Sequence, residues 1–276
     1  MRFRPYRRAS QFAVFALMFG IPVLNLYEIY TVTGTFYAVN IGGLGIADPV
    51  AILQTIFASG QVAPPILASI LFPAMLALIL GRVWCGWMCP YHLISDGAVW
   101  LRGTIRRRVL RRTEPEKLVV AKPFSANLVR YGFLIGGIAV TAAVGIPLLN
   151  FVSAPGILST EAMIFVKERT FSVEMLFIVT ILALELCLFP RFWCRLFCPT
   201  GSFIALFRTP FTLTVQAAAK NPNSKCCAND ACSEACPMGL APFKEGSNLL
   251  CTNCARCVDA CRSDGGGTLQ FGGFQS

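Results

Sequence analysis

The sequence predicts an all-α membrane protein with four transmembrane helices, arranged as two repeated hairpins and followed by a small cysteine-rich domain. Two observations support this fold class. Of the 276 residues, 55% are hydrophobic and only 14% are charged, whereas roughly a quarter of a soluble domain of this length is charged. In addition, one ten-residue motif occurs twice, each time after an apolar run of membrane length.

The repeated motif contains the pattern Arg-x-Trp-Cys-x3-Cys-Pro. It occupies Gly81–Pro90 and again Pro190–Pro199. A repeat that keeps an Arg, a Trp, two Cys and a Pro in register indicates two copies of one unit. We expect each unit to be a membrane helix that ends in a pair of thiols.

The four predicted spans are separate apolar stretches within residues 1–215, the predicted membrane domain. A hydrocarbon core of about 30 Å requires roughly 20 such residues. The first span follows four arginines within residues 1–10, and it is a retained helix rather than a signal peptide because no small-residue cleavage site follows it. The predicted spans are about 11–30, 62–80, 131–149 and 173–189.

Two of the segments between spans are predicted to be loops on the far side of the membrane. Residues 31–61 contain no Lys or Arg, and within them Asp48 caps and Pro49 opens a short helix that extends to Phe57. Residues 150–172 form the second loop.

The third segment, residues 91–130, is soluble and basic, with a helical pattern over 93–110 that ends in a run of arginines. A run of this kind could bind nucleic acid. Beside membrane spans, however, it favours a helix held on anionic lipid, so lipid rather than nucleic acid is the expected partner.

The distribution of basic residues predicts the orientation in the membrane. The N-terminus holds 4 Lys and Arg, residues 81–130 hold 10 and the chain from 190 onward holds 8, whereas the two far-side loops hold 0 and 2. Positive charge is retained on the cytoplasmic side of a membrane. Both termini, both thiol pairs and the cysteine-rich domain are therefore predicted to be cytoplasmic, at a bacterial inner membrane.

The cysteine-rich domain, residues 220–276, carries a ligand pattern for iron–sulfur clusters. Its run Cys251-x2-Cys254-x2-Cys257-x3-Cys261 has the spacing of a bacterial ferredoxin, in which three cysteines hold one cluster and the fourth reaches a second. We therefore expect a small ferredoxin-like domain. A structural zinc site is the alternative, although zinc sites more often pair two Cys-x2-Cys units across a longer gap.

A second, less regular run lies upstream and ends in Cys236-Pro237. The crossed pattern of ferredoxin ligation assigns Cys236 to the cluster of Cys251, Cys254 and Cys257, here called cluster 2. Cluster 1 would then use Cys261 and Cys232 with Cys226. At the remaining ferredoxin position stands Asn229. The fourth ligand is Cys227 in the preferred interpretation; the alternatives are a three-iron cluster, [3Fe-4S], or weak ligation by Asn229 or Asp230.

The membrane thiol pairs are Cys85 with Cys89 and Cys194 with Cys198. On a continuous helix, positions i and i+4 lie on one face, so two equivalent hairpins could bring all four thiols together. Four convergent thiolates suit a metal or an additional cluster. A redox disulfide, partner docking and simple packing of small apolar side chains remain alternatives.

Two further residues are candidates for proton chemistry near a quinone. His92 is the only histidine and follows Pro90, and Glu185 lies within the fourth span, where acidic residues are costly and usually functional. Trp84, Trp87 and Trp193 are most simply interface anchors, but they could also flank a quinone headgroup.

These motifs together resemble the NapH/MauN-type family of membrane ferredoxins, which includes the quinol-dehydrogenase membrane subunit of periplasmic nitrate reductase systems. The resemblance covers nearly the whole chain. It implies two [4Fe-4S] clusters, quinol as the electron donor, and a periplasmic or membrane-bound redox partner such as a ferredoxin-like or cytochrome subunit. Asn229, and Arg262 in place of the usual Pro after Cys261, depart from the ferredoxin pattern and affect cluster 1.

A second hypothesis comes from the chemistry of the thiols. Soft thiolates also select Cu(I), so the chain could be an assembly or regulatory protein for a periplasmic metalloenzyme. A transporter is disfavoured because, apart from Glu185, the predicted spans hold few ionisable groups.

Overall fold

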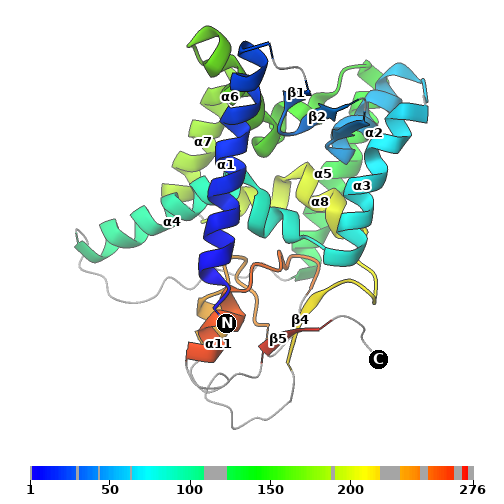
Figure 1. Ribbon diagram of the computed structural model, residues 1–276. Coiled ribbons are helices and arrows are strands. Elements are labelled where there is room, and N and C mark those ends of the chain that lie inside the picture. Colours follow the sequence, from blue (N-terminus) through cyan, green and yellow to red (C-terminus); the bar gives the residue numbers. More distant parts are fainter. Residues whose placement is uncertain are drawn as a thin grey trace.

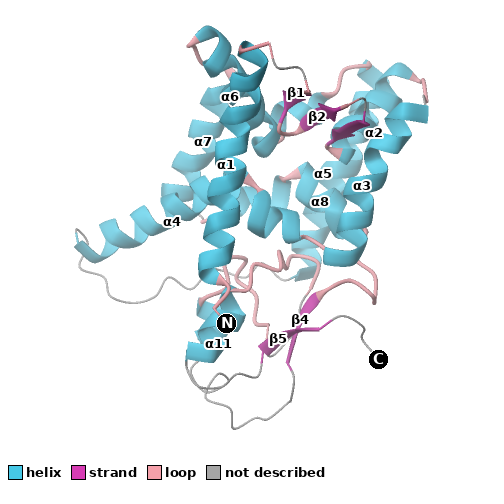
Figure 2. Ribbon diagram, viewed as in Figure 1, coloured by secondary structure: helices cyan, strands magenta, loops and turns pink. Residues whose placement is uncertain are grey.

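The structure, a computed structural model, is mostly helical (Figures 1 and 2). Its main helices are α1 (Arg4–Leu26), α2 (Pro49–Ser59), α3 (Pro64–Leu80), α4 (Pro90–Arg108), α5 (Pro123–Val144), α6 (Ala154–Glu168), α7 (Glu174–Cys187) and α8 (Pro199–Leu206). The structure describes residues 2–28, 31–42, 44–62, 64–108, 123–187, 190–217, 231–242, 248–263 and 269–272.

Helices α1, α3, α5 and α7 occupy the positions of the four predicted spans. Two of them, Arg4–Leu26 and Ser125–Val144 within α5, are long and apolar enough to cross a membrane, judged over the described residues. Helices α3 and α7 have only 17 and 14 residues. The structure therefore supports a membrane protein weakly, and the four-span topology stays a prediction.

The segment 31–61, predicted to be a far-side loop, contains a small sheet, so the chain is mostly helical, as predicted, but not all-α. Strands β1 (Val32–Thr35), β2 (Ala38–Ile41) and β3 (Leu44–Ala47) form an antiparallel sheet. The strands have four residues each and lack a strong alternation of apolar and polar side chains, which explains why no strand was predicted. The short helix was predicted correctly, because Asp48 accepts a hydrogen bond from the Val50 N–H (3.4 Å) and Pro49 lies in its first turn.

The segment 150–172, predicted to be the second far-side loop, is also more ordered than expected, since most of it forms α6. Its apolar residues Ile157, Leu158 and Ala162 recur at helical spacing and are buried. Pro155 lies in the first turn of α6, where proline is tolerated, but in the sequence it resembles a loop signal. Helix α6 packs against α1 and α7 (Figure 1).

The central core encloses the repeated motif. It joins Met18 of α1, Tyr91 of α4, Ile157 of α6 and Ile178 of α7 to Cys89 and Trp193 of the two repeats. The motif therefore lies where helices from both halves of the chain meet, rather than at an isolated helix end.

The cysteine-rich tail is attached to the helical part at several points. Strand β4 (Thr214–Ala217) pairs with β5 (Leu269–Gly272), and it straddles residue 215, the predicted end of the membrane domain. The backbone N–H groups of Phe3 and Arg4 donate to the carboxylate of Asp259, both at 2.8 Å. The tail thus lies against the start of α1 (Figure 1).

A glycine in α5 permits a close approach and yields a test of the packing. A Cβ at Gly137 would lie 2.8 Å from Leu149 Cγ and closer still to a methyl carbon of that side chain, whereas a Cβ at Gly136 would meet nothing within 4 Å. Leu149 is buried beside Val50 and Leu134. Gly137→Ala should therefore overpack this core at a cost of about 1–3 kcal/mol.

Gly136→Ala is the matched control, because it adds the same methyl group to the same helix in open space. Melting of the detergent-solubilised variants should show a lower midpoint for Gly137→Ala only. Equal midpoints would contradict the packing of α5 described here.

Candidate functional site

Four cysteines of the tail line one cavity. Cys251 and Cys254 lie in the loop before α11 (Arg256–Ser263), Cys257 lies in the first turn of that helix, and Cys236 follows the short helix α10 (Ala231–Glu234). Their charges interact, since Cys254, Cys251 and Cys236 all contribute to raising the pKa of Cys257 beyond the effect of burial. The structure thus brings together the four residues predicted as ligands of cluster 2.

The backbone around this cavity presents N–H groups to the sulfurs. Asn253 and Ala255 have φ angles of 50° and 62°, and alternation of left- and right-handed conformations directs successive N–H groups toward an anion. The Leu240 N–H donates to Cys236 Sγ at 3.4 Å, and the backbone N–H of Asn253 lowers the pKa of Cys251, which burial raises to about 12. Such donors stabilise thiolates that hold a cluster.

The chemistry of the four cysteines bears on the choice between a cluster and a single metal ion. A zinc site needs its ligands around one atom at about 2.3 Å. In a cubane each cysteine binds a different iron, so four sulfurs around a cavity fit [4Fe-4S] better than zinc.

Buried positive charge near the cavity also fits an anionic cluster. Asp96 of α4 pairs with Arg191, Arg256 and, at 3.3 Å, Arg8. The buried Arg7 donates to the Cys254 carbonyl oxygen at 3.2 Å. One carboxylate thus faces several guanidinium groups, and a thiolate-ligated cluster would supply compensating negative charge.

The predicted ligands of cluster 1 are only partly described. Cys232 and Cys261 are buried in one small core with Val215, Val258 and Leu269. Cys257 and Cys261 lie four residues apart on α11, so this helix contributes to both sets. Cys226, Cys227, Asn229 and Asp230 lie outside the described residues.

The membrane thiols lie on π-helical turns, which corrects the assumption of a continuous α-helix. The turns are Trp84–Met88 and Trp193–Phe197. Each is closed by an i+5 hydrogen bond, from Cys89 N–H to the Trp84 carbonyl oxygen (3.0 Å) and from Cys198 N–H to that of Trp193 (2.9 Å). The prolines that follow do not end these helices but begin α4 and α8.

The four membrane thiols lie near enough to one another for their charges to interact. Burial raises the pKa of Cys89, and Cys85 and Cys198 raise it further. Burial together with the Cys85 thiol raises the pKa of Cys198 to about 11. Burial also raises the pKa of Cys194, and the charges of Glu185, Cys198 and Cys89 raise it further. Cys89 and Cys198 each precede a helix and accept backbone N–H groups from its first turn.

The first thiol turn contacts the ligand loop of cluster 2 directly. Gly86 lies so close to this loop that a Cβ would be 2.6 Å from the Thr252 carbonyl oxygen and 3.1 Å from Cys254 Cβ. The indole N–H of Trp87 donates to the Asn253 carbonyl oxygen at 3.0 Å, and Gln11 holds the Gly86 carbonyl oxygen at 3.1 Å. Cys85 is therefore one residue from the contact with the loop that carries Cys254.

His92 lies beside Asp96 and its arginines, and Glu185 is close enough to Cys194 to raise the pKa of that thiol. The buried His92 ring is 3.1 Å from a guanidinium nitrogen of Arg191. Burial lowers the pKa of His92 well below its usual value, and the positive charge of Arg191 lowers it further. The buried Glu185 accepts the Ser95 hydroxyl at 2.6 Å. Of the three tryptophans that could flank a quinone headgroup, Trp193 is buried, and only Trp84 lines the cavity described next.

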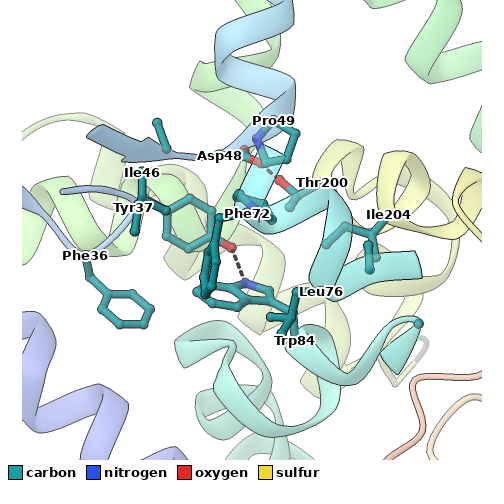
Figure 3. Close-up of a pocket in the computed structure, with 14 residues that line it drawn as sticks. Phe36, Tyr37, Ile46, Asp48, Pro49, Phe72, Leu76, Trp84, Thr200 and Ile204 are labelled. Carbon is teal, nitrogen blue, oxygen red and sulfur yellow. Dashed lines mark hydrogen bonds between the residues drawn. The ribbon is translucent and has the colours of Figure 1, made fainter. Parts of the chain in front are cut away.

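A second cavity lies between β3, α3, α8 and the first thiol turn (Figure 3). It has an empty volume of about 580 Å³, its open side included, and is mostly apolar. Tyr37 accepts the Trp84 indole N–H at 3.2 Å, and Thr200 donates to Asp48 Oδ2 at 2.9 Å (Figure 3). From the sequence alone Asp48 was predicted only as a helix cap, because its partner Thr200 lies in another part of the chain.

Comparison with known proteins assigns the chain to a family. It is 31% identical over 238 residues to the methylamine utilization ferredoxin-type protein MauN of Paracoccus denitrificans, covering 84% of this chain and 74% of that protein. The chain belongs to the MauN/NapH family of ferredoxin-type proteins. The ferredoxin-type protein NapH of Haemophilus influenzae is 25% identical over 271 residues, covering 94% of this chain and 87% of NapH.

Other comparisons bear on the repeat and on the fold. A family described as "4Fe-4S binding domain" matches residues 62–108 and 171–211, so the match includes both thiol repeats. The putative electron transport protein YccM of Escherichia coli is 22% identical, covering 93% of this chain and 72% of that protein. No solved structure matches significantly. This MauN/NapH member is thus an iron–sulfur protein of the electron-transfer type.

The contact at Gly86 is directly testable. Gly86→Ala places a methyl group against backbone and Cβ atoms of the ligand loop, which cannot rotate away. We expect the purified variant to lose about one cubane, roughly four irons, measured by iron analysis and by EPR after reduction.

Gly97→Ala in α4 is the control, because a Cβ there meets nothing within 4 Å. If Gly86→Ala kept the iron content and EPR spectrum of Gly97→Ala, the contact would not constrain cluster 2.

Proposed function

We propose that the chain is a bacterial inner-membrane electron-transfer protein that accepts electrons from quinol and passes them to a periplasmic or membrane-bound redox partner. The observation that carries the proposal is the contact between Gly86 of the first thiol turn and the Cys254 loop. It joins the helical part, where a lipid-soluble donor is found, to the cysteine-rich tail.

In this proposal two [4Fe-4S] clusters supply one-electron redox chemistry. Cluster 2 is held by Cys236, Cys251, Cys254 and Cys257. Cluster 1 is held by Cys261 and Cys232 with Cys226 and Cys227. The chain's own contribution is to bury the ligands, to orient backbone N–H groups toward the sulfurs and to surround cluster 2 with arginines.

The four thiols of the repeats form a third redox site in the same proposal, holding an additional metal or cluster. Two observations support it. Cys89 and Cys198 receive backbone N–H donors from the residues after a Cys-Pro step, as Cys236 does. The family described as a 4Fe-4S binding domain also matches the two thiol repeats themselves.

The membrane arrangement in the proposal keeps four spans, with both termini cytoplasmic. Exposed apolar side chains support spans at the two shorter helices, with Leu71, Met75 and Ile79 on α3 and Leu176 and Val179 on α7. Contiguous exposed apolar surface of this kind marks contact with lipid or with a partner. The excess of Lys and Arg in the predicted cytoplasmic segments supports the orientation.

An iron count tests the cofactor assignment. Two cubanes give about eight irons and a third gives roughly twelve. Replacing Cys254 by Ser should remove about four irons and the EPR signal of cluster 2. Replacing Cys85 and Cys198 together by Ser should remove only the iron held by the thiols. Cys187→Ser is the control, because Cys187 is an exposed cysteine outside every predicted set.

Electron flow tests the function itself. Anaerobic protein should be reduced by a quinol, and the Cys85/Cys198 double variant should lose that reaction while any metalloenzyme partner keeps its metal. Loss of the partner's metal instead would favour the assembly function. Iron-free protein, or clusters that no quinol reduces, would refute the proposal.

A further inference from the structure

We propose that the cavity of Figure 3 binds the quinol headgroup, with the Asp48 carboxylate accepting one of its protons. This inference rests on the proposed function and adds the location and the acceptor of the quinol reaction. It replaces His92 and Glu185 in that role, because neither residue lines the cavity.

The shape and lining of the cavity suit an aromatic ring with two hydroxyl groups. Phe36 stacks on Trp84 with ring centroids 5.6 Å apart and an interplanar angle of 17°, so a flat aromatic wall lies beside polar atoms of Tyr37 and Asp48. Pockets for small molecules are typically apolar, with a few placed polar groups that fix orientation. Figure 3 shows the Asp48, Tyr37, Trp84 and Thr200 side chains gathered around this space.

The surroundings of Asp48 prepare it to accept a proton. Its side chain is nearly buried, its Oδ2 accepts from Thr200 and its Oδ1 accepts from the Val50 N–H. Burial raises its pKa to about 6, and these two donors limit the rise. At neutral pH the carboxylate is therefore mostly ionised, with a pKa close to the range in which a general base works best.

The cavity has an apolar outer side where a prenyl tail would lie. Phe72 lines the cavity and is exposed, and its neighbours Leu71 and Met75 on α3 are exposed as well. In the proposed topology this face of α3 contacts lipid. A quinol could thus enter from the membrane with its headgroup toward Asp48.

The cavity is also connected to the loop of cluster 2 through three consecutive residues of the first thiol turn. Trp84 lines it, Cys85 follows Trp84, and Gly86 contacts the Cys254 loop. Thr200, which also lines the cavity, is two residues after Cys198. Electron transfer favours short distances, and one cysteine of each thiol pair is thus within two residues of the cavity wall.

The reaction balances within this arrangement. Oxidation of a quinol to a quinone breaks two O–H bonds and releases two protons and two electrons. Asp48 accepts one proton and water accepts the other. The two electrons pass one at a time to the oxidised iron–sulfur clusters assigned in the proposed function.

The test uses the full-length protein, purified anaerobically, with duroquinol as the reductant and bleaching of the cluster absorbance as the signal. Asp48→Asn should lower the rate about a hundredfold or more, the usual contribution of a general base, while dithionite still reduces its clusters. Asn is as good a helix cap as Asp, so α2 should persist. Glu168→Gln, at the exposed end of α6, should react as the unmodified protein does.

The outcomes separate the inference from the function on which it rests. If duroquinol reduces the unmodified protein and Asp48→Asn equally fast, the function stands and the cavity assignment fails. If Glu185→Gln abolishes the reaction while Asp48→Asn does not, Glu185 is the acceptor and the assignment again fails. If no quinol reduces the unmodified protein although dithionite does, both fail.

A binding measurement gives a second readout that does not depend on turnover. An azido-quinone should photolabel peptides that contain Tyr37, Phe72 or Trp84, and excess duroquinone should suppress the labelling. Labelling confined to peptides from other parts of the chain would overturn the assignment.

Discussion

The structure depends on a backbone contact that only glycine permits. At Gly86 the first thiol turn lies against Thr252 and Cys254 with no room for a methyl group, and Trp87 and Gln11 hold the two sides of the contact by hydrogen bonds. This contact, together with the hydrogen bonds from Phe3 and Arg4 to Asp259, joins the helical part to the cysteine-rich tail. The equivalent position in the second repeat is Arg195, so the two repeats are not interchangeable.

Burial of charge imposes the second constraint. Asp96 of α4 binds Arg8 from α1, Arg191 from the second repeat and Arg256 from the tail, so one carboxylate joins three parts of the chain. Removing one partner of a buried ion pair typically costs about 3–5 kcal/mol. In the proposed assignment an anionic cluster compensates the arginines around Cys254, and we expect folding of this region to be linked to cluster binding.

Local spacing made part of this architecture predictable. The Cys-x2-Cys-x2-Cys run and the crossed ligation pattern placed Cys236 beside Cys251, Cys254 and Cys257, and the four do line one cavity. The repeat was evident because it preserves identical residues. The π turns were not predictable from the i,i+4 spacing, since a π turn differs from an α turn by one inserted residue. The role of Asp48 depends on Thr200, 152 residues away, and short strands give too weak a pattern to detect.

The hydrogen bonds between the start of α1 and the tail have a consequence for biosynthesis. The amide groups of Phe3 and Arg4 find their acceptor in Asp259, a residue made about 255 residues later. At a synthesis rate of roughly 5–20 residues per second, Asp259 is made on the order of ten seconds or more after α1. The helices are therefore synthesised before the tail, and the contacts between them form last. Any iron that enters cluster 2 thus binds after the first helix has been made.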